Sequence, residues 1–225
     1  MAVINLKGTI TAKSELSADI TVIYNFALQH MKAAIEFAKL AKKVECDNAS
    51  KKCGSFFEEI RTYVSSAIIL SVCALEANIN EHLVSSDGIL KHYSDDERAQ
   101  IFNIIQYLKI KEKYQYGLIV NKKSQLKFDK EPFESFKYLI SFRNSLVHYK
   151  PESDKDLSSS KKLEKKLRSK IQQSPFFPKG DCFITKRAMS YSCAKWAVNK
   201  ALNFSKKYSK ALGIPDRFSY LKPLR

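Results

Sequence analysis

The sequence lacks the short motifs that mark several common enzyme classes. Its 225 residues include only six glycines, and no group of them forms a glycine-rich phosphate-binding loop. Neither a nucleophile elbow nor the Ser-His-Asp order of a hydrolase triad occurs. We therefore set aside nucleotide hydrolysis through a phosphate loop and triad-type acyl transfer.

Metal-ligand patterns are also missing. The cysteines contain no C-x-x-C pair of the kind that structural zinc sites use, and they stand at Cys46, Cys53, Cys73, Cys182 and Cys193. His30, His82 and His92 have no metal-ligand spacing with acids or cysteines. We expect free thiols, of which Cys73 and Cys193 are small core residues, and neither a metal nor a cofactor.

No targeting or membrane-spanning pattern is visible. Residues Met1 to Lys13 lack the cationic start and apolar core of a signal peptide. No apolar run approaches the roughly 20 residues of a membrane span. We expect a cytoplasmic protein without membrane contact.

Acidic residues are scarce relative to basic ones. The chain has 39 Lys plus Arg against 23 Asp plus Glu, which gives a formal net charge of +16. Such a surface attracts polyanions, including nucleic-acid backbones, without sequence specificity. An anionic membrane surface, or a lysine-rich surface with no partner, would fit the same composition.

Hydrophobic periodicity predicts a mainly α, antiparallel helical bundle in one domain over residues 1–225. Period-two alternation predicts a short N-terminal strand extension over 1–16, and the stretch 114–128 is a candidate β-hairpin around Asn121. Helices are expected over about 18–44, 55–83, from Ser94, from Pro132 to before Pro151, and over about 186–212. Ser55 with Glu58, and Ser94 with Glu97, match capping boxes. Residues 153–180 form a basic arm or linker before the last helix.

The stretch Phe133–Pro151 carries the chemistry. Phe136, Ile140, Arg143 and Val147 recur at three and four, which places Arg143 on the core-facing stripe of a helix. Asn144 lies one turn before His148, so its amide can orient the imidazole. His148 itself stands in the last turn, where the helix dipole favours a protonated ring.

An arginine and a histidine at one helix end meet the needs of metal-independent phosphodiester cleavage. The imidazole can move the proton of the 2′-hydroxyl or of the leaving oxygen, and the guanidinium can stabilise the developing charge. The alternative is structural: Arg143 pairs with a buried glutamate and His148 caps the helix. The spacing alone does not separate these two interpretations.

The run R-N-S-L-V-H-Y-K-P at Arg143–Pro151 resembles the C-terminal signature helix of HEPN domains, whose hallmark is Arg, four to six residues, then His. The run L-E-A-N-I-N-E at Leu75–Glu81 is similar to the second helix of several HEPN families. Together the resemblance covers roughly 55–151. It implies a HEPN-like fold and a homodimeric endoribonuclease in which two signature helices form one composite site.

The resemblance also implies residue roles. Arg143 would bind phosphate, His148 would transfer a proton, and Asn144 would orient the site, with Glu76 and Tyr149 as supporting neighbours. Tyr149 follows His148 directly, whereas one toxin branch has an intervening residue, and the chain has no nucleotidyltransferase signature.

RNA is the expected partner, bound by the basic residues Lys150, Lys161, Lys162, Lys165, Lys166 and Arg168. A toxin or antiviral-defence role, with an antitoxin or defence partner protein, is the expected setting. The alternative is a non-catalytic HEPN module that binds nucleic acid or a partner protein.

Overall fold

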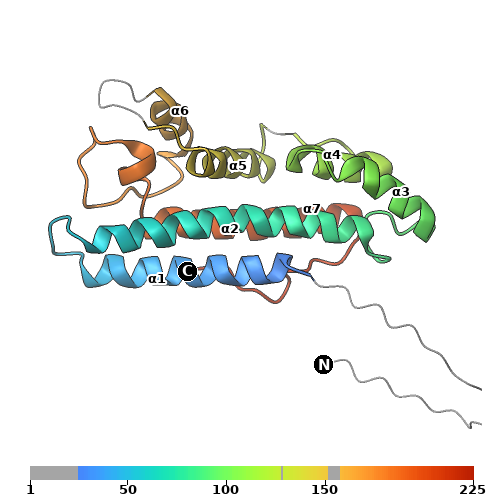
Figure 1. The fold of residues 1–225 in the computed structure, drawn as a ribbon, viewed down its shortest axis with the longest axis horizontal. Coiled ribbons are helices and arrows are strands. Elements are labelled where there is room, and N and C mark those ends of the chain that lie inside the picture. The colour runs from blue at the N-terminus through green and yellow to red at the C-terminus, as the bar shows by residue number, and fades with distance from the viewer. Residues whose placement is uncertain (1–24, 128, 152–157) are drawn as a thin grey trace, which may run out of the picture.

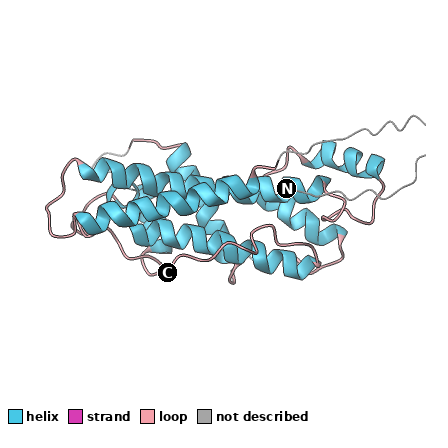
Figure 2. Ribbon diagram, turned by 90° about the horizontal axis from the view of Figure 1, so that it is seen from below, coloured by secondary structure: helices cyan, strands magenta, loops and turns pink. Residues whose placement is uncertain are grey.

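The computed structural model describes residues 25–127, 129–151 and 158–225, and this part of the chain contains eight helices and no strand (Figures 1 and 2). The elements are α1 (Ala27–Asp47), α2 (Phe56–Val84), α3 (Asp95–Ile105), α4 (Ile110–Val120), α5 (Phe133–Val147), α6 (Ser158–Leu167), the short π-helical turn η1 (Phe183–Arg187) and α7 (Tyr191–Leu212). The expectation of a mainly helical protein is confirmed.

Three long helices, α1, α2 and α7, form the base of the molecule (Figure 1). Helix α1 buries Met31, Ala34, Ile35 and Ala38, because this three- and four-residue spacing makes one apolar stripe. Its first amides are capped from a neighbouring helix: Glu81 Oε1 on α2 accepts hydrogen bonds from Phe26 N and Ala27 N at 2.9 and 2.8 Å. The bundle is therefore joined by polar as well as apolar contacts.

Helix α2 is the central element. It packs against α1, α7 and α5, and its buried residues lie on more than one face, including Val64, Ile68, Val72 and Leu75. By length and composition α2 is able to cross a membrane, contrary to the expectation that the chain has no membrane-spanning pattern. Half of its most apolar 18-residue window is buried in this structure. Core helices of many proteins share these properties.

A second layer, formed by α4 and α5, lies over the three-helix base (Figure 1). Four aromatic rings connect this layer to α7. Phe136 on α5 stacks on Phe204 of α7 with centroids 3.8 Å apart, and Tyr114 on α4 meets Phe204 and Tyr208 edge-on, each at 4.7 Å. Such pairs add to the stabilisation from burial, so α4 and α5 are held in fixed register on α7.

Helix α6 covers the end of α5 rather than extending into solvent as an arm. Leu163 and Leu167 are buried on its inner face, and Glu164 Oε1 and Oε2 accept hydrogen bonds from Arg187 Nη1 and Nη2 at 2.7 and 2.5 Å. The buried Arg187 guanidinium also donates to the carbonyl of Asp181 and to Gln173 Oε1. Within the expected basic arm or linker over 153–180, residues Ser158–Leu167 are therefore a docked helix.

The predicted hairpin over 114–128 is wrong, because Tyr114–Val120 belongs to α4. The run Leu118–Val120 looked like a strand, but buried Ile110, Tyr114, Gly117 and Leu118 repeat with helical spacing. The predicted N-terminal strand lies outside the described residues.

One of the two predicted capping boxes forms. Ser94 and Glu97 make both reciprocal contacts at the start of α3. Ser55 has helical backbone angles, with φ −55° and ψ −31°, and its side chain makes no capping bond. A residue inside the helical turn cannot direct its hydroxyl to the amides that an N-cap serves.

The core contains one fully buried histidine, His82 on α2. Neither of its ring nitrogens has a hydrogen-bond partner among the described residues. Burial, reinforced by the nearby Arg217 cation, lowers the pKa of His82 to about 4. The ring is therefore neutral in the folded protein near neutral pH.

Candidate active site

Arg143 projects from α5 toward α2, where it meets Glu76. Its Nη2 lies 3.3 Å from Glu76 Oε2, and the arginine side chain is only 20% exposed. The Nε atom of Arg143 is buried without a partner among the described residues. The carboxylate therefore satisfies only part of the guanidinium, and the rest remains available to another acceptor.

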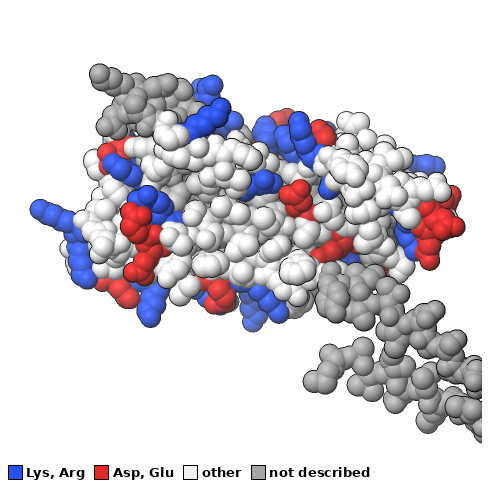
Figure 3. Space-filling model, viewed as in Figure 1, with Lys and Arg blue, Asp and Glu red and all other residues white. Residues whose placement is uncertain are grey.

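A hollow of about 630 Å³ opens at this pair. We call it the basic hollow, because its lining includes Lys109, Lys111, Lys137, Arg143 and Lys166, with Glu76 as its one carboxylate. Figure 3 shows Lys and Arg side chains gathered over the junction of α5 with α4 and over α6 on the face it displays. The positive charges of the lining outnumber its single carboxylate, which favours the binding of an anion with more than one negative charge.

A buried lysine lies near the carboxylate of the basic hollow. Lys113 on α4 is almost fully buried, and its Nζ donates a hydrogen bond to Asn80 Oδ1 at 2.9 Å. Burial lowers the pKa of Lys113, an effect that the nearby Glu76 opposes. Glu76 thus has a second cation in its surroundings besides Arg143.

His148 is the C-cap of α5, where its backbone N–H donates to the carbonyl of Asn144 at 2.9 Å. The residue is exposed and lines a separate hollow of about 330 Å³ with Tyr149, Lys150 and Ile184. No side-chain hydrogen bond joins Asn144 to His148 in the described part of the chain, so the expected amide–imidazole contact does not form.

The two hollows are neighbours that share one wall. Ser141 and Asn144 line both of them. Arg143 and His148 are five residues apart, so their side chains leave the α5 axis about 140° from each other. Within one chain the guanidinium therefore faces the basic hollow and the imidazole faces the other hollow, with Ser141 and Asn144 between them.

No family model matches the chain. Neither a curated protein nor a solved structure matches it. The resemblance to HEPN domains therefore depends on the sequence motifs quoted above alone.

The basic residues expected to bind RNA lie on different faces. All five α6-region cations are exposed, namely Lys161, Lys162, Lys165, Lys166 and Arg168. Of these, Lys166 lines the basic hollow, and Lys150 lines the hollow at His148. The remaining four line neither hollow.

Three lysines of the basic hollow were missed in the sequence analysis. Lys137 was within reach of sequence reasoning, because Lys137, Ser141 and Asn144 follow the four- and three-residue steps of one helical stripe. Lys109 and Lys111 begin α4 and reach the hollow through the packing of α4 beside α5, which no local pattern encodes. Over the described ranges no group of three or more His, Cys, Asp or Glu residues is placed to hold a metal ion.

Proposed function

We propose that the chain is a cytoplasmic, metal-independent endoribonuclease of the HEPN type that acts as a homodimer. The observation that carries the proposal is the basic hollow, where a half-satisfied Arg143 stands among four lysines. A polyanion with a phosphate at this point would meet a cation able to stabilise charge on its non-bridging oxygens. His148, on the other side of the shared wall, supplies an imidazole, a side chain that can donate or accept a proton.

The proposed reaction is transesterification. The 2′-oxygen attacks the adjacent phosphorus, the bond from phosphorus to the 5′-oxygen breaks, and the 2′-hydroxyl proton leaves while the 5′-oxygen gains a proton. The His148 imidazole takes up the 2′-hydroxyl proton and then supplies a proton to the 5′-oxygen, and Arg143 stabilises the charge that develops on the phosphorus oxygens. The products are a 2′,3′-cyclic phosphate and a 5′-hydroxyl.

A second copy of the chain brings the two groups together in this proposal. Val147 and Tyr149, which flank His148, are 49% and 41% exposed, so the end of α5 presents apolar surface beside the imidazole. A twofold contact here would bring His148 of each protomer toward Arg143 of its partner, so the composite site at the interface would contain two equivalent pairs, each able to act as one site.

Activity of point variants tests the chemistry. His148→Ala and Arg143→Ala should each lower cleavage of a 5′-labelled RNA in EDTA by about 10²- to 10⁴-fold, while circular dichroism stays unchanged. His92→Ala, at another exposed histidine, is the matched control and should cleave normally. Full activity of His148→Ala, or activity that EDTA abolishes, would overturn the mechanism.

Mixing the two inactive variants tests the composite site. In a heterodimer of Arg143→Ala with His148→Ala, one of the two sites keeps both groups if each site draws on both protomers. With free exchange of subunits, about one quarter of wild-type activity should return. No recovery after verified exchange would refute a site shared between protomers.

The second candidate is a non-catalytic HEPN module that binds nucleic acid or a partner protein such as an antitoxin. It is favoured by the pairing of Arg143 with Glu76 and by the place of His148 as the C-cap of α5, which are the structural roles named above as the alternative for these two residues. The same RNA incubation separates the two, because the module would retain RNA without shortening it.

A further inference from the structure

A line of lysines leads away from the basic hollow around Tyr138. Lys137 and Lys166 line the hollow, and their Nζ atoms lie 5.5 and 5.7 Å from the centroid of the Tyr138 ring. Lys170 places its Nζ 5.5 Å from the same centroid. Three ammonium groups from α5, α6 and the residues after α6 therefore surround one partly exposed ring.

The line continues into another hollow on α7. This hollow, which we call the α7 hollow, has a volume of about 330 Å³, and its lining includes Lys170, Lys195, Lys200, Tyr191 and Trp196. Lys170 belongs both to the surroundings of Tyr138 and to the α7 hollow. The basic hollow, Tyr138 and the α7 hollow are thus linked by shared lysines, and we call this surface the basic track.

The cations of the basic track are only partly neutralised. Lys170 pairs with Glu134 at 2.9 Å, and Lys200 pairs with Glu131 at 3.1 Å. By contrast, no described carboxylate lies within ion-pair distance of Lys137, Lys166 or Lys195. Lys137 and Lys166 line the basic hollow and Lys195 lines the α7 hollow, so unneutralised charge is present at both ends of the track.

Aromatic side chains accompany the lysines. Tyr138 lies between the two hollows, while Tyr191 and Trp196 line the α7 hollow. The Trp196 indole N–H is buried and finds no acceptor in the described part of the chain. Trp196 is only 6% exposed, so the faces open to bases are those of the partly exposed Tyr138 and Tyr191. Exposed aromatic faces beside a line of cations are what a single nucleic-acid strand requires, because its bases can stack while its phosphates pair.

We propose that the basic track binds single-stranded RNA, with backbone phosphates along Lys137, Lys166 and Lys195 and with bases against Tyr138 and in the α7 hollow. A duplex is excluded because its bases are stacked inside and offer no faces to these rings. The proposal rests on the proposed function for the choice of RNA, and it gives that site a substrate class. The bound strand passes over the track and presents one phosphate to Arg143.

Binding is measured in the His148→Ala background, so that the RNA stays intact. The probes are oligouridines of four and twelve nucleotides and a twelve-base-pair RNA duplex. Trp196 is the only tryptophan of the chain, so quenching of its fluorescence reports an occupied α7 hollow. The twelve-nucleotide strand should quench it and bind at least tenfold more tightly than the four-nucleotide strand, because only the longer strand covers both hollows.

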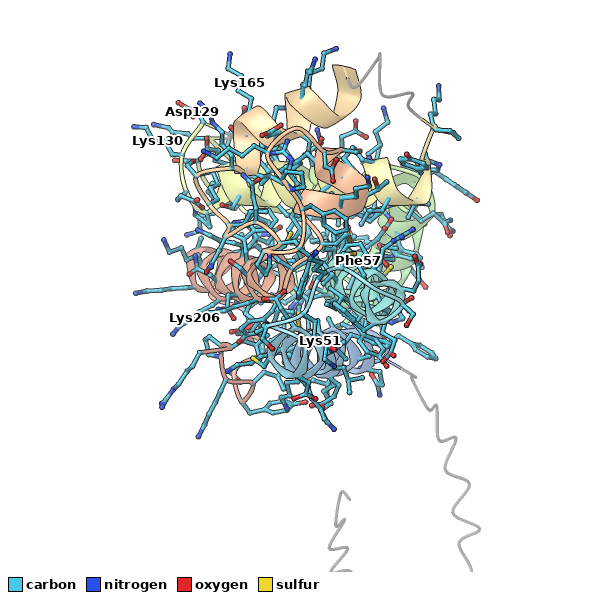
Figure 4. The ribbon with its side chains drawn as sticks, turned by 90° about the vertical axis from the view of Figure 1, so that its left-hand side faces the viewer. Lys51, Phe57, Asp129, Lys130, Lys165 and Lys206 are labelled. Carbon is cyan, nitrogen blue, oxygen red and sulfur yellow. The ribbon has the colours of Figure 1, made fainter. Side chains whose placement is uncertain are left out.

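A charge-matched pair of variants locates the contact. The triple variant Lys137→Gln, Lys166→Gln, Lys195→Gln should lower the slope of log affinity against log salt by about two, since each phosphate contact in a single strand contributes about 0.7. The control, Lys43→Gln, Lys51→Gln, Lys52→Gln, removes equal charge from exposed positions at and beyond the end of α1 and should leave the slope unchanged. Figure 4 shows Lys51 in the lower half of the view and Lys165 of α6 at its top.

Three results would overturn the proposal that RNA binds along the basic track. They are an equal loss of RNA affinity in both triple variants, equal affinity for the duplex and the single strand, and unquenched Trp196 fluorescence. Failure of the proposed function looks different. In that case wild-type protein leaves RNA intact, while strand-selective binding, quenching and the variant-specific salt slope all remain.

Discussion

Gly117 is a point where one added methyl group should loosen the layer that carries the basic hollow. It lies within α4, and a Cβ built there would overlap the hydroxyl oxygen of Tyr208 and come within 3.1 Å of Ile89 Cδ1. The Tyr208 hydroxyl is fixed, because it donates a hydrogen bond to the Tyr114 carbonyl at 3.0 Å. Alanine at this position must therefore displace a buried, bonded group.

The opposing effects in Gly117→Ala can be compared. Alanine favours a helix interior over glycine by about 0.5–1 kcal/mol. Overpacking a well-filled site costs about 1–3 kcal/mol, and losing the Tyr208 hydrogen bond costs about 1 kcal/mol more. The clash should prevail, with a net loss of roughly 2 kcal/mol in the free energy of unfolding.

A double-mutant cycle with Tyr208→Phe checks this reasoning by urea unfolding. Tyr208→Phe removes the oxygen that obstructs the added methyl group and should itself cost about 1 kcal/mol. In that background Gly117→Ala should be nearly neutral. If Gly117→Ala stabilises the wild-type chain, or costs the same in both backgrounds, the packing argument at α4 is refuted.

Three further predictions concern the fold and the dimer. The pKa of His82 is about 4 in the folded protein, below its value in the unfolded chain, so the free energy of unfolding should be highest above about pH 6.5 and fall by up to about 3 kcal/mol toward pH 4. Urea unfolding across this range checks the prediction, and His82→Gln should make the free energy of unfolding less dependent on pH. Arg187→Ala should leave Glu164 without its cation and release α6, so limited trypsin digestion at the α6 lysines should accelerate several-fold; unchanged cleavage would contradict the docking. Val147→Glu should convert the dimer to a monomer in light scattering, whereas Ile119→Glu, at a similarly exposed position, should not.

The helices were largely predictable because their apolar periodicity is long and consistent. The second helix was expected over about 55–83 and is Phe56–Val84. The last helix was expected over about 186–212 and is Tyr191–Leu212, followed by Gly213 with a φ of 65°. The hairpin error arose in a short apolar run, where periodicity over a few residues does not separate strand from buried helix. The surroundings of α4 decide that case, since Tyr114 is buried against Phe136 and Phe204.

The candidate site was predictable along α5 and, through the resemblance, at Glu76 of α2. Arg143, Asn144 and His148 follow from one helical segment, but their relative directions separate the guanidinium from the imidazole. The pairing of Arg143 with Glu76 joins residues 67 positions apart, and Lys109 reaches the same hollow from α4. These contacts depend on tertiary packing, so local spacing could suggest a cation for Glu76 but not the lysines around it.

In the docked helix α6, the residues that attach it to the protein are different from those that carry its exposed charge. Leu163, Glu164 and Leu167 attach it to the protein, while Lys161 and Lys165 face solvent. Substitution of the solvent-facing lysines by uncharged residues should therefore lower the positive charge of the surface at little cost in folding stability. A substitution at Glu164 should detach the whole helix. Selection can therefore change polyanion affinity in small steps through the lysines, while the residues that attach the helix stay constrained.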